Sequence, residues 1–324
     1  MLLRDRKKSI DRHQAFFVTA ILLVLGFAPM GCGEGEPSPT SAGKAAAAPI
    51  VFASNAPLAW MVRELAGGAV GVITPWSSQD GEGEDWSPTD AEIRLLQGAS
   101  LIVLNGADFE PWAGRVAIAR TLLLDTTAAC EAVLIKQDGI EHAHGPRGAH
   151  SHSGFASTTW LSPILYAEQA DAIARRLARL VPADAQAISG RLARVQERLR
   201  ALDRELKESA KQAPQWLASH PVYQYLAASA GASISAVHWE PADLPSAAQW
   251  AELEAARATI DRERVPMLWE GEPLPEVREH LEQLGIVVVV YPPFGQRNGD
   301  FLQSCETAAA KLRASTAESV GKPK

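Results

Sequence analysis

Residues 191–212, RLARVQERLRALDRELKESAKQ, decide the fold. Apolar side chains recur in this stretch at the spacing of a helix, and charged side chains occupy the other helical faces. The apolar positions are Leu192, Val195, Leu199, Leu202 and Leu206. The pattern begins near Ala183, so we expect a helix of about 30 residues, roughly 45 Å long. A second helix is expected just before it, over residues 163–180.

Eight short apolar runs lie outside this helical region, four on each side of it. They are residues 50–54, 70–74, 101–106, 121–125, 215–219, 234–239, 265–270 and 286–291. Most are continuously apolar, which is typical of parallel strands covered on both faces. Helical patterns separate them, two of which begin after the expected N-caps Thr89 and Ser246. We predict an α/β fold of two lobes, each with a four-stranded, mostly parallel sheet flanked by helices, joined by one long connecting helix.

The first 31 residues have the pattern of a secretory signal. Residues 1–14 carry five basic and two acidic side chains, and an apolar run and small residues follow. The run of about 15 residues is shorter than the roughly 20 that a membrane span needs. Cys32 resembles the lipidated cysteine of a bacterial lipobox, although Pro29 stands where lipoboxes usually have Leu. We expect a periplasmic or cell-surface lipoprotein anchored at Cys32; the alternative is an ordinary secreted protein.

These patterns predict the organisation of the whole chain. A signal peptide (1–31) and a flexible tether rich in Gly, Ser, Pro and Ala (32–49) precede the folded part. An N-terminal lobe (50–162), a helical connector (163–213) and a C-terminal lobe (214–316) follow, and residues 317–324 form a disordered tail. We expect the protein to be a monomer.

The charge of the chain excludes some partners. The net charge is −7, and removal of residues 1–31, which carry +3, leaves a mature chain near −10. An acidic protein is poorly suited to bind nucleic acid or anionic lipid head groups.

The predicted mature part of the chain keeps two cysteines, Cys130 and Cys305. We expect that they do not form a disulfide.

Candidate ligands gather after the predicted strands. In parallel sheets a ligand binds beyond the carboxyl ends of the strands, which for two lobes means the cleft between them. The polar side chains at those ends are Glu84 and Asp85 after the second run, His220 after the fifth, His238 and Glu240 at the end of the sixth, and Glu270 and Glu272 after the seventh. Imidazoles together with carboxylates suit zinc and similar divalent ions.

A histidine-rich stretch, EHAHGPRGAHSH (141–152), follows the fourth run and is predicted to be a loop. It holds four of the eight histidines of the chain. Its first half, with His142 and His144, suits a low-affinity metal antenna or a solvated loop. Its second half, with His150 and His152, stands closer to the segment TTWLSP (158–163).

The order and spacing of five segments carry a family resemblance. They are WSPTDAEIRLLQGASLIVLNGADFEPW (86–112), TTWLSP (158–163), ASHPVYQYLAASAG (218–231), EGEPLPEV (270–277) and YPPFG (291–295). The chain is similar to the zinc/manganese-type solute-binding lipoproteins of bacterial ABC importers, over about residues 50–315. The resemblance implies two α/β lobes joined by one rigid helix, a divalent ion as cargo, and the membrane subunits of an ABC importer as partner.

The ligands that the resemblance implies are mostly absent. That family binds its metal with three histidines and one carboxylate. The first histidine position falls here on Glu84, beside Asp85, the second on Thr158, and the carboxylate position on Pro292. The third histidine position alone is kept, as His220 in SHPVYQY. A standard three-histidine site is therefore not what this sequence encodes.

Replacement donors lie nearby. His150 and His152 stand eight and six residues before Thr158, and the chain resembles a branch of the family with an HSH-type loop before TTWL. The predicted set is His152 or His150, His220, one carboxylate from Glu84 and Asp85, and one from Glu240 and Glu272. Such a set would make a near-tetrahedral zinc site. His238 is a further candidate ligand, and Glu270 is expected to be structural.

The sequence thus predicts a binding protein and no enzyme. It would capture a divalent metal ion. We expect Zn²⁺, because the candidate ligands include several histidines. Mn²⁺ or another divalent ion is the alternative, because carboxylates are also available. The alternative is a protein that binds a small organic solute or a metal chelate, since three family ligands are lost. A hydrolase with a zinc-bound water and Glu240 as base is a third hypothesis, which the absence of an HExxH motif disfavours.

Overall fold

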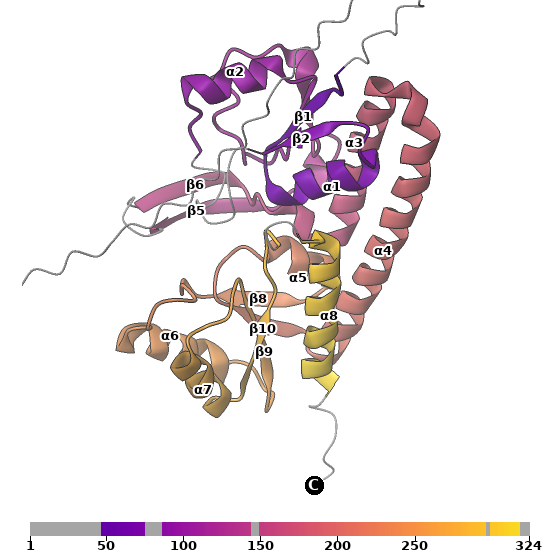
Figure 1. Cartoon of the computed structure of the whole chain (residues 1–324). Coiled ribbons are helices and arrows are strands. Elements are labelled where there is room, and N and C mark those ends of the chain that lie inside the picture. Colours follow the sequence, from indigo (N-terminus) through magenta and orange to yellow (C-terminus); the bar gives the residue numbers. More distant parts are fainter. Residues whose placement is uncertain (1–46, 75–85, 144–148, 296–298, 318–324) are drawn as a thin grey trace, which may run out of the picture. The chain divides into compact units, whose positions relative to one another are not determined.

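The computed structural model describes residues 47–74, 86–143, 149–295 and 299–317, and for residues 137–143 and 149–153 the backbone alone. The chain divides into residues 1–46 and a second unit, residues 47–324. Both four-stranded sheets lie in the second unit (Figure 1).

The N-terminal half of the unit is built on a parallel sheet. Its strands are β1 (Ile50–Ala53), β2 (Gly71–Ile73), β3 (Leu101–Leu104) and β4 (Leu123–Asp125), in the order β2-β1-β3-β4. Each neighbouring pair is parallel. The helices α1 (Ala56–Ala66) and α2 (Asp90–Gly98) belong to this half. All four residues of β3 are buried, as the continuous apolar run predicted.

The C-terminal half repeats this plan. The strands β7 (Gln215–Ala218), β8 (Ser233–Ala236), β9 (Val265–Trp269) and β10 (Ile286–Val290) form a parallel sheet in the order β10-β9-β7-β8. Its helices are α5 (Gln224–Ala230), α6 (Ala247–Ala258), α7 (Pro275–Gln283) and α8 (Phe301–Ala317). All eight predicted strands are therefore confirmed within their predicted runs or one residue beyond them.

Two long helices connect the sheets. They are α3 (Pro163–Leu180) and α4 (Ala185–Gln212), separated by a short 3₁₀ turn over Pro182–Asp184. Figure 1 shows α4 lying along both halves, where it contacts α1 and α3 as well as α5 and α8. Val195, Leu199, Leu202 and Leu206 are buried in a hydrophobic cluster that contains residues of both sheets. Full burial of such a side chain stabilises a fold by roughly 1.5–3 kcal/mol, so α4 holds the two lobes together. The predicted two-lobe fold class is confirmed.

The helix starts follow the predicted capping signals. The Thr89 hydroxyl accepts from the Glu92 backbone N–H while the Glu92 carboxylate accepts from the Thr89 backbone. Ser246 and Gln249 form the same reciprocal pair at the start of α6. Such a capping box satisfies two backbone donors that the helix leaves without partners. Short 3₁₀ turns lie at Arg120–Leu122, Glu131–Val133 and Thr159–Leu161.

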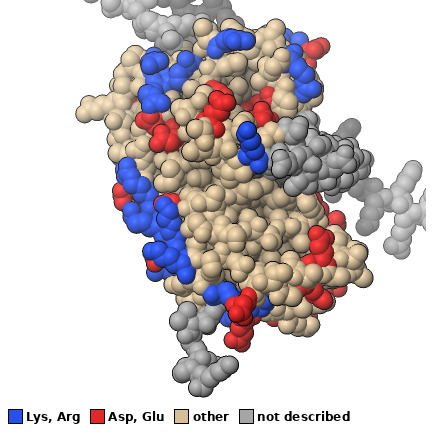
Figure 2. All heavy atoms as spheres, turned by 180° about the vertical axis from the view of Figure 1, so that it is seen from behind, with Lys and Arg blue, Asp and Glu red and all other residues tan. Residues whose placement is uncertain are grey.

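The outer face of α4 is charged. Figure 2, seen from behind, shows basic and acidic side chains next to one another along the edge that α4 forms. Arg200 pairs with Glu197 at 3.1 Å and Lys211 with Glu208 at 2.6 Å, each across about one turn of the helix. Exposed pairs of this kind add little stability. They keep one face of α4 in water while the other is buried.

None of the helices in the described part of the chain combines the length and the apolar character that a membrane span requires.

The histidine-rich stretch is not the loop that the sequence predicted. Residues Lys136–Ala143 (β5) and Ala149–Phe155 (β6) form an antiparallel hairpin that pairs His142 with His150 and Ile140 with His152. The loop prediction was wrong because the stretch is polar on both strands, so no apolar alternation marks it. The turn-type sequence GPRG between the two strands was the available signal.

The two cysteines of the described part, Cys130 and Cys305, are free thiols, as expected.

Candidate metal centre

His220 follows β7, one of the two inner strands of the C-terminal sheet, and is 3% exposed. The chain segments after the two neighbouring strands run along both sides of it. On one side the Trp239 backbone N–H donates to the Ser219 carbonyl at 3.0 Å, and on the other the Ser219 N–H donates to the Leu268 carbonyl at 2.8 Å. Residues 238–240 and residue 270 are therefore brought to His220 by the register of the sheet.

The segment after β8 alternates in burial. Val237 and Trp239 are buried in the core of the lobe, whereas His238 and Glu240 are exposed. Because successive side chains of an extended segment point to opposite faces, His238 and Glu240 share one face. The apolar partners of the alternation thus fix the direction of the two candidate ligands.

Three of the four predicted residues of this lobe come together. His220 Nε2 lies 3.4 Å from Glu240 Oε1, and the rings of His220 and His238 are 6.3 Å apart between centroids, with planes at 80°. Two donors on one tetrahedral zinc ion, at Zn–N and Zn–O bonds near 2.1 Å, are separated by about 3.4 Å. His220 Nε2 and Glu240 therefore have the spacing of two ligands on one ion.

A fourth polar side chain of this region was expected to be structural. Glu270 directly follows β9, and its Oε1 lies 3.9 Å from His220 Nδ1, with the side chain 25% exposed. The two ring nitrogens of His220 thus face one carboxylate each. The signal in the sequence was the position of Glu270 at the end of the strand beside that of His220.

Glu272, the alternative carboxylate, is placed elsewhere. Its Oε1 accepts a hydrogen bond of 2.6 Å from Arg278 Nε on α7, and its side chain is 64% exposed. The structure pairs Glu272 with Arg278 rather than with His220.

The remaining candidate ligands cannot be located at side-chain level. Glu84 and Asp85 lie outside the described residues, as do His144 and the side chains of His142, His150 and His152. Among the residues that the structure does describe, no group of three or more His, Cys, Asp or Glu side chains is arranged to hold a metal ion. His220 and Glu240 are thus a pair of donors within this part of the chain.

Two of the three segments that carry lost family ligands, those of Thr158 and Pro292, are hydrogen-bonded to the turn after His220 or to each other. The Thr158 hydroxyl donates a hydrogen bond of 2.6 Å to the Val222 carbonyl. Trp160 Nε1 donates one of 2.7 Å to the carbonyl of Pro293, the neighbour of Pro292. Both positions therefore belong to the same region as His220, although neither residue offers an imidazole or a carboxylate.

The tryptophans near this region differ in burial. Trp160 and Trp239 are 2% exposed and belong to the core, whereas Trp86 is half-buried and stacks on Phe52.

A buried polar network positions the Thr158 segment. The Asn105 side chain donates to the carbonyls of Gly106 and Ser157, at 2.9 and 2.8 Å. Its carbonyl oxygen accepts from Thr159 Oγ1 at 2.8 Å and from Gln169 Nε2 at 2.9 Å. An amide can make four such bonds, so Asn105 is saturated. It ties the end of β3 to the 157–159 segment and to α3.

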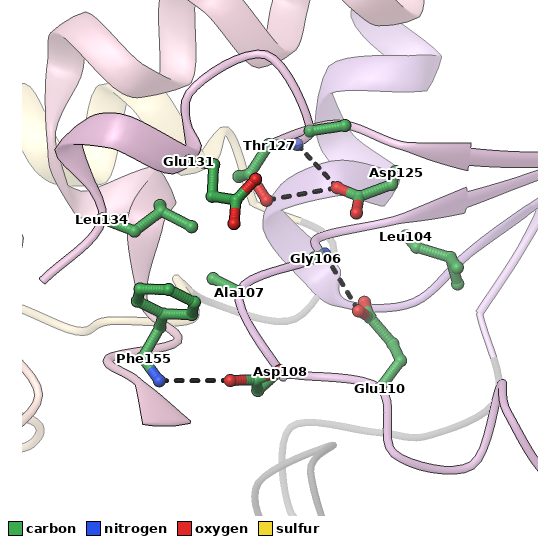
Figure 3. Close-up of a pocket in the computed structure, with 11 residues that line it drawn as sticks. Leu104, Gly106, Ala107, Asp108, Glu110, Asp125, Thr127, Glu131, Leu134 and Phe155 are labelled. Atoms are coloured by element: carbon green, nitrogen blue, oxygen red, sulfur yellow. Dashed lines mark hydrogen bonds between the residues drawn. The ribbon is translucent and has the colours of Figure 1, made fainter. Parts of the chain in front are cut away.

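A pocket of about 310 Å³ opens beside β3 and β4 (Figure 3). Four carboxylates line it: Asp108, Glu110, Asp125 and Glu131. Three of them accept hydrogen bonds from backbone N–H groups: Asp108 from Phe155, Glu110 from Gly106, and Asp125 from Thr127. Gly106 has a φ of 80°, and a Cβ there would collide with the Asp125 carboxylate. These contacts give three of the four carboxylates a structural role: Asp108 and Glu110 hold the turn after β3, and Asp125 holds the turn after β4.

Known proteins resemble this chain along most of its length. The family model of the zinc-uptake complex component A, periplasmic (ZnuA), matches residues 51–312. The zinc-binding lipoprotein AdcA of Streptococcus pneumoniae is 27% identical over 187 residues, which are 53% of this chain and 36% of that protein. The aligned part thus spans only about a third of this curated relative.

Solved structures share the fold. The metal-dependent lipoprotein YcdH of Bacillus subtilis superposes with a TM-score of 0.66 at 18% identity, covering 82% of this chain and 98% of its own. The Zn(II)-bound ZnuA-like domain of Streptococcus pneumoniae AdcA gives a TM-score of 0.65 at 19% identity, covering 83% and 99%. With the family model matched over most of the sequence and the two-lobe fold shared, the chain belongs to the ZnuA family of periplasmic zinc-uptake components.

Proposed function

We propose that this protein captures Zn²⁺ outside the cytoplasm and delivers it to an ABC importer. Family membership supports the transport role, because the matched family consists of zinc-uptake components. The observation that carries the proposal is the His220–Glu240 pair, whose 3.4 Å separation suits two ligands of one zinc ion. No catalytic step is part of the function: affinity comes from donors that the fold holds in place.

The proposed ligands come from both lobes. The C-terminal lobe supplies His220 and Glu240, with His238 beside them. In this proposal the N-terminal lobe completes the shell with His152 or His150 and with one carboxylate from Glu84 and Asp85. Glu240 is preferred to Glu272 because Glu240 faces His220, whereas Glu272 is paired with Arg278. Imidazole donors favour zinc over manganese, which prefers more oxygen ligands.

The cellular setting follows from the N-terminal sequence. We propose that Cys32 carries a lipid anchor and that residues 33–49 tether a monomeric binding domain near the membrane subunits of the importer. The zinc-binding lipoprotein AdcA is a relative with an anchor of this class.

Metal stoichiometry tests the proposal. The full chain, purified in mild detergent, is dialysed against zinc and analysed for bound elements and for small molecules. We expect one zinc ion per chain, loss of zinc in His220→Ala, and weakened binding in the His150→Ala/His152→Ala double variant. His280→Ala is the control, because His280 is not among the predicted ligands and its ring stacks on Trp250 at 4.1 Å.

Two results would contradict the proposal. If His220→Ala and the double variant both bind zinc like the wild type, the site lies elsewhere. If the wild type retains an organic solute or a metal chelate and no free zinc ion, the protein has kept the fold for a different ligand.

A further inference from the structure

We propose that Glu270 is the positioning residue of His220: its carboxylate accepts the proton of Nδ1 and so presents the lone pair of Nε2 to the metal. This inference rests on the proposed zinc-binding function and deepens it. It gives a role in the metal centre to a residue outside the predicted ligand set.

The sheet register creates the juxtaposition. His220 follows the inner strand β7, Glu240 lies in the segment after β8, and Glu270 follows β9. The neighbours of β7 on its two sides are β8 and β9. The imidazole therefore stands between two carboxylates, with Glu240 Oε1 3.4 Å from Nε2 and Glu270 Oε1 3.9 Å from Nδ1.

The exposure of the two carboxylates assigns their roles. A neutral imidazole carries one N–H and one lone pair, and only the lone pair can bind a metal. The Glu240 side chain is 48% exposed and lies on the face that His238 shares, where an ion can reach it. The Glu270 side chain is 25% exposed. Burial raises the pKa of Tyr223 well above its usual value, and the nearby negative charge of Glu270 raises this pKa as well. The proton therefore belongs on the inner, Glu270 side and the metal on the outer, Glu240 side.

The distance to Glu270 fits a contact that closes on metal binding. At 3.9 Å the Nδ1–Oε1 separation is about 1 Å longer than a hydrogen bond. Ligating histidines commonly donate their second N–H to a carboxylate, which fixes the tautomer and the ring orientation. Rotation of the Glu270 side chain by a small amount would close the gap. Since His220 is almost fully buried, its ring has few other orientations.

The test compares Glu270→Ala and Glu270→Gln with the wild type in the full chain. Zinc affinity is measured by competition with a chromophoric chelator at pH 7.5. Long-range ¹H–¹⁵N NMR reads which nitrogen of the His220 ring carries the proton. We expect the wild type to hold its proton on Nδ1, and Glu270→Ala to populate both tautomers and to lose 10- to 100-fold in affinity, the usual effect of removing such a partner. Glu270→Gln, which keeps an acceptor oxygen, should recover part of the loss.

The matched control is Glu272→Gln, which neutralises a carboxylate two residues away that is paired with Arg278. It should leave both the affinity and the tautomer of His220 unchanged. An affinity within twofold of the wild type in Glu270→Ala, an unchanged tautomer, or metal bound at Nδ1 would each overturn the role of Glu270. Were Glu270→Ala to fold poorly, the same readings on Glu270→Gln decide. Failure of the proposed function itself looks different: the wild type would bind no zinc.

Discussion

His220 Nε2 and Glu240 Oε1 lie 3.4 Å apart at the ends of neighbouring segments of the C-terminal sheet. The relationship joins a histidine that the family resemblance predicts with a carboxylate that it does not. It indicates how a chain that lost three family ligands can still offer paired donors to an ion.

Replacement of Glu240 is therefore expected to weaken zinc binding. Glu240→Gln removes an anionic ligand but keeps the size of the side chain, so the affinity should fall by at least about tenfold, since even the loss of an outer partner costs 10- to 100-fold. Isothermal titration calorimetry at pH 7.5 measures the effect. Glu272→Gln is the control, because it makes the same chemical change at a different position. An equal loss of zinc affinity in the two variants would contradict the assignment of Glu240 as a ligand.

Zinc affinity should also fall as the medium becomes acidic. Histidine binds a metal only in its neutral form, so protons compete with zinc for the imidazole. Free imidazole side chains take up a proton near pH 6.5, and binding is therefore expected to weaken steadily from pH 7.5 to pH 5.5. Calorimetry across this range checks the expectation. A constant affinity would argue against histidine ligation as a whole.

Most of the fold could be predicted from local patterns. Most of the eight strands are continuous apolar runs such as residues 101–104 and 286–290, a pattern typical of strands in parallel sheets. Thr89 and Ser246 mark helix starts because their hydroxyls replace missing hydrogen bonds. The hairpin of β5 and β6 escaped prediction because the sequence of its strands is mostly polar, so no apolar alternation marks them.

The candidate site could be predicted only in part. Strand ends place His220, His238 and Glu240 in one region, and this much follows from topology. The sequence EGE, by contrast, offers Glu270 and Glu272 with nothing to separate them. The choice is made by the start of α7, which brings Arg278 within 2.6 Å of Glu272 and leaves Glu270 beside His220. Such a choice depends on tertiary contacts that no local pattern encodes.

The Asn105 network should contribute strongly to stability. Asn105→Ala removes four hydrogen bonds and leaves buried groups of Thr159 and Gln169 without their acceptor, which at about 1 kcal/mol per bond predicts a loss of roughly 3 kcal/mol or more. Urea unfolding of the metal-free protein measures it. Gln97→Ala is the control, because the exposed Gln97 makes a single bond to the Ala117 carbonyl and should cost little. A similar, small effect of both substitutions would show that the network adds little to stability.

Glu110 should make the stability depend on pH. Burial raises the pKa of Glu110 to about 7, against the hydrogen bonds that its carboxylate accepts from the backbone N–H groups of Asn105 and Gly106. The unfolded chain has the ordinary value near 4.5, so between pH 4.5 and 7 the folded state binds the proton more tightly. Stability is then lost as the pH rises through this window, by roughly 3 kcal/mol in total, and changes no further above it.

The variant Glu110→Gln isolates this contribution from other titrating groups. It cannot ionise, so the difference in unfolding free energy between the wild type and Glu110→Gln should shift against the wild type as the pH is raised from 5 to 8. Urea unfolding at four pH values, with a chelator present so that metal binding does not contribute, gives this difference directly. A difference that stays constant, or that moves in favour of the wild type, would mean that the backbone donors of Asn105 and Gly106 outweigh burial and keep the carboxylate charged.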